Sequence, residues 1–434
     1  MVSPDSPPDH VTPYDRFAWS DATVAQWLAS GEHRAELTAY FGATEYRDLA
    51  ALARRAQRTP LSDATRAVIV VPGIMGSQLG IRRAPPLPDD IVWIDPIDIQ
   101  HGRLRSLSVP GPARIVPLGV VLFSYLRLKL RLRASGFAAE FYDYDWRLST
   151  AATGRDLAER LRTHRAARLS VVAHSLGGLV ARAALAQPGL QKVERVILLG
   201  TPNHGSYAAV QALRGTDAVV RKVARLTPAD SAESLASDVY GTFPSLYDLL
   251  PPGSTRTALF DAATWPRSGP QPRAPLLEGA RADRERLAAP EARFISIAGI
   301  GQPTVTGVAR RGDDFLYTIT RAGDGTVPAA SAALAGTRVF FARVAHSELT
   351  RDPRVGAAVV DLLRRGATKR LPANWRGTNR AQAQVSDSQL RRLHAAKVNW
   401  GTLSPDERRA FLQTLNEPVS VTLRVPAKRA RALS

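Results

Sequence analysis

The sequence predicts an α/β fold in which helices cover both faces of a mainly parallel β-sheet. Short apolar runs alternate with segments whose apolar residues recur at helical spacing, as they do in βαβ units. One apolar run ends at Ser175 and continues at once as a helical pattern, which places a serine on a sharp strand-to-helix turn. A chain of 434 residues with 44% hydrophobic residues can bury such a sheet.

The first part of the chain, residues 1–60, is predicted to be a helical extension. Residues 1–13 are rich in Pro, Ser and Asp, and we expect them to be disordered. Residues 19–58 carry apolar side chains at helical spacing, with Gly31 and Gly42 as breaks. We expect these helices to pack against the main domain.

The main domain is predicted to span residues 61–370. It starts with the buried-strand run AVIVV and the turn PGIMGS. The predicted elements that follow are a helix at 118–134, a strand in FAAEFYDYDW, a helix at 152–165, the strand before Ser175 and a strand in RVILLGTP. Strand character returns in RFISIAGI, DDFLYTIT and TRVFFARV, and a helix after Pro353 closes the domain.

The alternation of strands and helices stops over residues 202–290, which are rich in Ser, Asp, Pro and Gly. An insertion that follows the carboxyl end of a strand lies over the crevice where open α/β sheets bind ligands. We therefore predict a cap, or lid, over an active site.

The last part, residues 371–434, is predicted to be a basic and partly helical extension. It has 11 basic and 4 acidic residues, a net charge of +7 within the +19 of the whole chain. Two short helices are predicted, since Ser386 and Ser404 each precede a Gln or Glu by three residues. The tail lacks the alternation of aromatic and basic residues that single-strand binders use for base stacking. We expect solvated surface charge, with an anionic membrane and then nucleic acid as alternatives.

Composition restricts the location and the chemistry. No apolar stretch reaches the length of a membrane helix, and MVSPDSPPDH has no apolar signal core. A cytoplasmic protein is predicted, with peripheral contact to a membrane left open. The absence of cysteine excludes disulfides, thiolate nucleophiles and Cys-ligated zinc.

Ser175 is the candidate nucleophile, in the sequence AHSLGG. Ala173 and Gly177 are small enough for a tight elbow, and the N–H of Leu176 opens the helix that follows. That N–H is suited to stabilising an oxyanion. A second oxyanion donor is predicted at the main-chain N–H of Ile74 in PGIMGS, for which a plain glycine turn is the alternative.

A serine nucleophile needs a base and a group that orients the base. Three histidines follow Ser175, and His346 is the predicted base because it comes after the strand run VFFARV. We expect His204 to have a structural or pocket-lining role and His394 to lie on a solvated face.

Asp324 is the predicted acid, because the glycines of GDGTVP let a loop turn tightly enough to present its carboxylate. A turn-capping role for Asp324 is the alternative, and Asp313 and Asp314 are the other candidate acids.

Six motifs stand in one order along residues 67–365: VPGIMGSQL, YDYDWR, AHSLGG, TPNHGS, GDGTVP and His346. This ordered set resembles the lecithin:cholesterol acyltransferase-like group of α/β-hydrolases. The resemblance implies a triad of Ser175, Asp324 and His346, with an oxyanion hole from the backbone of Ile74 and Leu176. It also implies lipid acyl esters as substrates, phospholipids included, and no metal or organic cofactor.

The chain differs from the secreted animal members of that group, because it has no cysteine and no secretion signal. It looks more like an intracellular bacterial-type relative. The function predicted from the sequence is that of a serine hydrolase or acyltransferase that acts on phospholipid or neutral lipid through an acyl-enzyme on Ser175. The alternatives are a catalytically silent binding module with this fold, and an anionic-membrane or nucleic-acid binder that acts through the arginine-rich tail.

Overall fold

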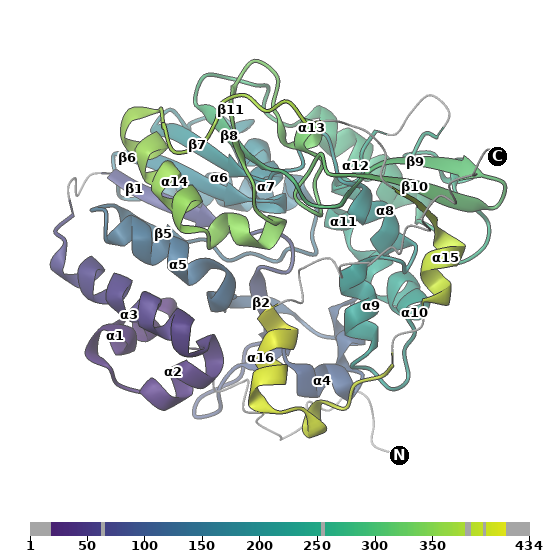
Figure 1. Ribbon diagram of the computed structural model, residues 1–434, viewed down its shortest axis with the longest axis horizontal. Coiled ribbons are helices and arrows are strands. Elements are labelled where there is room, and N and C mark those ends of the chain that lie inside the picture. The colour runs from purple at the N-terminus through teal and green to yellow at the C-terminus, as the bar shows by residue number, and fades with distance from the viewer. Residues whose placement is uncertain (1–18, 62–65, 253–256, 378–382, 394–395, 414–434) are drawn as a thin grey trace, which may run out of the picture.

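The computed structural model describes residues 19–61, 66–252, 257–377, 383–393 and 396–413 (Figure 1). The predicted disorder of residues 1–13 and the predicted solvated face of His394 lie outside these ranges. Among the described residues, no helix has both the length and the apolar character needed to cross a bilayer.

A six-stranded sheet in which all neighbouring strands are parallel forms the centre of the molecule, which confirms the predicted fold class. Its strands, in spatial order, are β11 (Arg338–Ala342), β8 (Phe294–Gly299), β7 (Val193–Leu199), β6 (Arg168–His174), β1 (Arg66–Val71) and β5 (Ala138–Phe141). Carboxyl ends of parallel strands meet at one edge, and this edge positions the candidate site.

Apart from charged residues near their amino ends, such as Arg66 and Arg168, the central strands are mostly apolar, because both faces of the sheet are covered. In β1, Val68 and Val70 pack in one core with Leu128, whereas Ile69 and Val71 pack in another core with Leu179. Two helices lie on each face (Figure 1): α5 (Leu122–Arg133) and α14 (Pro353–Arg365) on one, α6 (Thr150–Thr163) and α7 (Leu176–Leu185) on the other.

The N-terminal helices pack on α5, at the lower left of Figure 1. They are α1 (Asp21–Ser30), α2 (Arg34–Phe41) and α3 (Ala43–Arg58), and the breaks between them fall at Gly31 and Gly42 as predicted. Apolar side chains of all three contact α5, and Arg127 of α5 donates two hydrogen bonds to Glu45 at 3.0 and 2.6 Å.

A small antiparallel sheet follows the PGIMGS turn. Its strands are β3 (Asp90–Trp93), β2 (Ser77–Ile81) and β4 (Val116–Val120), with α4 (Pro96–Gln100) and the 3₁₀-helix η2 (Arg103–Leu107) between β3 and β4. The helix predicted over 118–134 was therefore wrong at its start. Residues 116–120 pair with β2, and the helix begins only at Leu122.

The chain between β7 and β8 is mostly helical. Its elements are α8 (Tyr207–Leu213), α9 (Ala218–Ala224), α10 (Ala232–Asp238), η3 (Tyr240–Thr242), α11 (Pro244–Asp248), η4 (Ala262–Thr264) and α12 (Ala274–Glu285). These helices lie beside the carboxyl edge of the central sheet, at the right of Figure 1. We refer to this inserted segment as the cap.

A third sheet holds β12 (Ala383–Ser386), β10 (Asp314–Thr320) and β9 (Thr304–Arg311), all antiparallel. The sequence analysis predicted β10 but not β9. The remaining elements are α13 (Ala329–Ala332), η5 (His346–Thr350), α15 (Asp387–Arg392), η6 (Trp400–Thr402) and α16 (Pro405–Gln413). Both predicted tail helices form, and Ser386 and Ser404 cap them through reciprocal bonds with Gln389 and Glu407.

Candidate active site

Ser175 stands on a strained turn between β6 and α7. Its backbone has φ 52° and ψ −126°, a combination that non-glycine residues rarely adopt and that costs energy. The N–H of Ser175 donates to the carbonyl oxygen of Leu199 at 2.9 Å, which continues the sheet up to the turn. Gly177 is required by close packing, since a Cβ there would lie 2.3 Å from the carbonyl oxygen of Pro72.

The three residues predicted as a triad lie in one hydrogen-bonded line. Nε2 of His346 is 2.9 Å from Oγ of Ser175, and Nδ1 of His346 is 2.8 Å from Oδ2 of Asp324. All three side chains are buried. The site thus joins the turn after β6, the start of η5 and the loop after β10.

The other oxygen of Asp324 fixes the rotamer of this carboxylate. Oδ1 accepts hydrogen bonds from the N–H groups of Thr326 and Val327 at 3.0 and 2.7 Å, so that Oδ2 is left for the imidazole. The N–H of His346 also donates to the carbonyl oxygen of Asp324 at 2.9 Å. Asp324 does cap its own turn, but it contacts His346 at the same time.

The geometry defines the tautomer of His346. An ionised Asp324 can only accept, so Nδ1 of His346 carries the proton and the lone pair of Nε2 faces the Ser175 hydroxyl. Gly200 leaves room for this pair. Gly200 has φ 54°. A Cβ at this position would lie 3.1 Å from Nδ1 of His346 and only 2.6 Å from Cδ1 of Leu349, so a larger residue would crowd the histidine.

The alternative acids and base lie elsewhere. Asp313 is exposed and accepts the N–H groups of Arg267 and Ser268, which is a turn-stabilising role. Asp314 binds Ser388 of the tail. His204 does not line the cavity beside Ser175, so of its two predicted roles the pocket-lining one was wrong. Its side chain is hydrogen-bonded to the backbone of Ala333, which fits the structural role.

The two predicted oxyanion donors come from segments next to the serine: Leu176 follows Ser175, and Ile74 follows Gly73, where a Cβ would lie 2.8 Å from Cβ of Ser175. Within the described residues, the main-chain N–H groups of Ile74 and Leu176 have no hydrogen-bond acceptor. Leu176 is the first residue of α7, whose N-terminal dipole favours negative charge. The Ile74 turn is held by its neighbours, because Met75 has φ 61° and its carbonyl oxygen accepts from the indole N–H of Trp93 at 3.0 Å.

Two further residues, Tyr125 and His174, connect the parts of this site. The Tyr125 hydroxyl accepts the N–H of Gly73 at 2.9 Å, so its own proton donates to Nδ1 of His174 at 3.0 Å. Nε2 of His174 then donates to the carbonyl oxygen of His346 at 3.1 Å. Burial and the neighbouring His346 hold the pKa of His174 well below its usual value, and burial raises the pKa of Tyr125.

The sequence analysis gave neither Tyr125 nor His174 a role. Tyr125 belongs to a helical run with no motif of its own, and only the packing of α5 against the end of β6 reveals its contact. A histidine directly before the serine was the one available signal.

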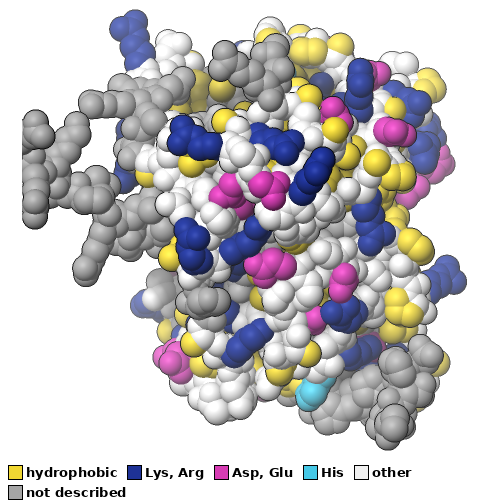
Figure 2. Space-filling model, turned by 90° about the vertical axis from the view of Figure 1, so that its right-hand side faces the viewer, with side chains coloured by type: hydrophobic (Ala, Val, Ile, Leu, Met, Phe, Trp, Pro, Cys, Tyr) yellow, Lys and Arg dark blue, Asp and Glu magenta, His cyan; other side chains and the backbone are white. Residues whose placement is uncertain are grey.

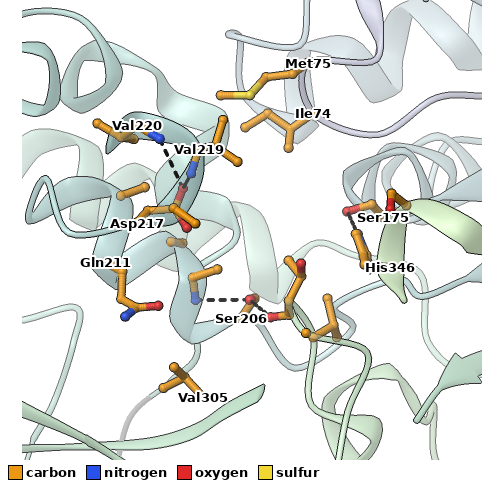
Figure 3. A pocket seen from close by; sticks show the side chains of 18 of the residues that line it. Ile74, Met75, Ser175, Ser206, Gln211, Asp217, Val219, Val220, Val305 and His346 are labelled. Carbon is orange, nitrogen blue, oxygen red and sulfur yellow. Dashed lines mark hydrogen bonds between the residues drawn. The ribbon is translucent and has the colours of Figure 1, made fainter. Parts of the chain in front are cut away.

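A cavity of about 710 Å³ opens beside Ser175 (Figure 3). Figure 3 shows Ser175 and His346 at one side, and Asp217, Val219 and Val220 of the cap at the other. Most of the side chains that line the cavity are apolar, among them Ile74, Met75, Leu246, Leu249, Val305, Ile319 and Val327. Such a cavity suits a ligand with a large hydrophobic part.

No group of three or more His, Asp or Glu side chains in the described ranges could hold a metal ion. Basic side chains are scattered over the face that holds β9, β10 and α15, and acidic and apolar ones lie among them (Figure 2). This distribution agrees with solvated surface charge.

The comparisons with known proteins extend over different parts of the chain. No curated protein matches it. Three solved structures are similar to this chain. The mature lipase BlEst2 of Bacillus licheniformis is 16% identical over 71% of this chain and 94% of its own, with a TM-score of 0.36, and a chain of the Tle4–Tli4 complex is 16% identical over 69% of this chain and 98% of its own, with a TM-score of 0.41. EstA of Clostridium botulinum is 11% identical over 70% of this chain and 87% of its own, with a TM-score of 0.36. Residues 144–235, which include the serine turn, match the family described as a PGAP1-like alpha/beta domain.

Proposed function

We propose that this protein is a serine hydrolase or acyltransferase that acts on lipid acyl esters. The observation that carries the proposal is the line of hydrogen bonds from Asp324 through His346 to Ser175, at the wall of a largely apolar cavity. Two unpaired N–H groups beside the serine add the means to stabilise an oxyanion. The resemblance to the lecithin:cholesterol acyltransferase-like group supports the substrate class.

In the proposed mechanism, Nε2 of His346 takes the proton of Ser175 as Oγ attacks the acyl carbonyl carbon. The N–H groups of Ile74 and Leu176 bind the oxyanion of the tetrahedral intermediate. His346 then gives its proton to the leaving alcohol, and an acyl-enzyme forms. Water or a second alcohol attacks that acyl-enzyme, with His346 again as base. The choice between these acceptors separates a phospholipase or lipase from an acyltransferase.

The alternative of an anionic-membrane or nucleic-acid binder has less support. Most basic side chains in the described part of the tail contact the molecule itself. Arg391 pairs with Asp387, Lys397 donates to main-chain carbonyls, and Arg408 donates to the carbonyl oxygen of Trp400. Their charges are therefore partly used within the fold.

Replacing Ser175 by alanine is expected to abolish both labelling by a fluorophosphonate probe and turnover of p-nitrophenyl acyl esters. The reason is that Oγ of Ser175 is the nucleophile of the proposed acyl-enzyme and is the atom that His346 activates. Ser30→Ala, at an exposed serine of α1, is the control and should retain both. Mass mapping of the labelled peptide decides the result: a label on another serine, or full turnover by the alanine variant, contradicts the proposal.

Replacing Tyr125 by phenylalanine is expected to lower kcat by roughly 10- to 100-fold with little change in KM. The change leaves the buried N–H of Gly73 without its acceptor, which costs about 1–3 kcal/mol, and it removes the proton donor of His174. Tyr142→Phe, at a half-buried tyrosine outside this hydrogen-bonded set, is the control. Steady-state kinetics measure the effect. If kcat is unchanged in Tyr125→Phe, or if only KM changes, Tyr125 does not position the catalytic groups.

A further inference from the structure

The cavity beside Ser175 continues past the cap as far as the C-terminal part of the chain. Val385, Leu390 and Leu393 line the same cavity as Ser175; Val385 and Leu390 are buried, and Leu393 is exposed. We call these three residues the distal wall. Val385 stands in β12, which pairs with β10, and Leu390 stands on α15.

Apolar side chains border the distal wall on the side of the third sheet, whereas Arg221 of α9, which also lines the cavity, donates to the carbonyl oxygen of Leu393 on another side. Val305 of β9 and Ile319 of β10 line the cavity as well, and both pack against the core cluster that contains Val385 and Leu390. Val305 lies across the cavity from Ser175 in Figure 3. This part of the cavity therefore offers a surface for an alkyl chain, whereas the hydrogen-bonding groups of the proposed mechanism gather at the serine.

A fully buried ion pair holds the distal wall in place. Asp387 and Arg214, neither of them exposed, join α15 to the end of α8, with Oδ2 of Asp387 2.7 Å from Nε of Arg214. Oδ1 of Asp387 accepts the hydroxyls of Tyr317 and Thr216 at 2.6 and 3.3 Å. A buried charge needs such complete pairing, since the loss of one partner leaves the other charge unpaired and strongly destabilises the fold.

Arg214 also binds the loop that follows η4. Its guanidinium donates to the carbonyl oxygens of Pro266 and Pro270 at 3.2 and 2.6 Å, and to that of Ser268. The start of α15 is thus fixed to the cap and to the third sheet at once.

The segment after α15 is bound to the other cap helix of the cavity. Nζ of Lys397 donates to the carbonyl oxygens of Ala224, Thr227 and Asp230 at 2.8, 2.7 and 2.6 Å, at the C-terminal end of α9. A cation at this end of a helix is favourable. Helix α9 carries Val219 and Val220, which line the cavity opposite the serine. The tail thereby supports two sides of the same cavity.

We propose that residues 383–393 form the end of the substrate site, and that the side chain of Leu390 limits the length of the alkyl chain that the site accepts. This proposal rests on the ester hydrolysis proposed above. In this proposal the tail determines the specificity for alkyl chain length. The sequence alone had indicated only a basic extension outside the main domain. Tight contact at the end of an apolar pocket changes kcat/KM by about tenfold or more between substrates that differ by one methylene group.

The first test is a series of substrates with Leu390 variants. Leu390→Trp is expected to leave kcat/KM for the acetyl p-nitrophenyl ester within about twofold and to lower it for the decanoyl and dodecanoyl esters at least about tenfold. Leu390→Ala is expected to shift the preference towards longer chains. Arg392→Trp, on the exposed side of the same helix, is the control and should keep the wild-type profile. A second series varies the alcohol of acetate esters.

A shift of the Leu390 variants in either series supports the distal wall, and profiles that coincide with the wild type in both series overturn it. A second measurement uses the unaltered protein, in case the variants fail to fold. An alkyl fluorophosphonate with a diazirine at the tip of a long chain is fixed on Ser175 and photolysed. Cross-links within residues 383–393 are expected with the long chain but not with a short one, and cross-links confined to other segments overturn the proposal.

The two experiments separate this inference from the proposed function. Wild-type protein that neither turns over esters nor takes the probe on Ser175 contradicts the enzymatic proposal itself. Wild-type protein that does both, with Leu390 variants of unchanged chain-length preference, contradicts only the role of the distal wall.

Discussion

Asp324→Asn is expected to lower kcat by about 10⁴-fold while the protein keeps its fold. The amide oxygen of the asparagine will take the place of Oδ1, because the N–H groups of Thr326 and Val327 both require an acceptor there. The amide nitrogen then faces His346, where the carboxylate oxygen stood. Nδ1 of His346 must now accept, its proton moves to Nε2, and Nε2 can no longer take the proton of Ser175. Turnover of acyl esters measures the loss.

The sequence provides a matched control for this prediction. Asp313→Asn changes an exposed aspartate that accepts two main-chain N–H groups in a similar way but does not contact the imidazole. We expect its kcat to stay within about twofold of the wild type, since surface substitutions away from special features have small effects. An Asp324→Asn variant that is as active as Asp313→Asn would show that Asp324 only caps its turn.

The sequence predicted the centre of the molecule well because the signals there are local. A strand buried on both faces must be largely apolar, as β1 is after Arg66, and a serine elbow needs small neighbours, as Gly177 shows. The loop glycines of GDGTVP and the histidine after β11 marked two loops at the same edge of the sheet. The structure brings those loops to Ser175 through hydrogen bonds across 22 and 171 residues of sequence.

The elements that the sequence did not reveal depend on contacts that are distant in the chain. Strand β4 lies in a run with helical spacing, and only pairing with β2 makes it a strand. Strand β9 is half-exposed and polar, and antiparallel pairing with β10 defines it. The same holds for Tyr125, whose hydroxyl contacts the Gly73 turn 52 residues away. Local propensity cannot encode such pairings, which form only when the fold closes.

The second large effect concerns stability and its dependence on pH. Asp248, the last residue of α11, is 2% exposed, and Oδ2 accepts the N–H of Thr150 at the start of α6 at 2.6 Å. Within the described residues its Oδ1 has no hydrogen-bond partner. Burial raises the pKa of Asp248 from 3.8 to about 7, because a charged carboxylate loses its hydration there. The carboxylate thus joins the cap to the main sheet domain at an energetic cost.

The sign of the pH effect follows from this raised pKa. Between pH of about 4 and 7 the folded state holds a proton on Asp248 that the unfolded chain has lost, so the free energy of unfolding decreases as pH rises through this window. Asp248→Asn should remove that decrease. It is expected to be close to the wild type at pH 4 and more stable by up to about 4 kcal/mol at pH 8. Urea unfolding at a series of pH values measures the difference.

The comparison of variant with wild type isolates Asp248 from the other titrating groups, since these are common to both proteins. A further control is necessary because the chain is strongly basic, so that the loss of any negative charge could alter its stability. Asp156→Asn, at an exposed carboxylate of α6, tests for such a general effect. We expect Asp156→Asn to change the free energy of unfolding by less than about 0.5 kcal/mol at every pH. The hydrogen bond from Thr150 and the nearby charge of Arg284 act in the opposite direction and lower the pKa of Asp248. If Asp248→Asn loses stability at pH 8 as well as at pH 4, these two groups hold the carboxylate charged, and its burial does not control the pH dependence.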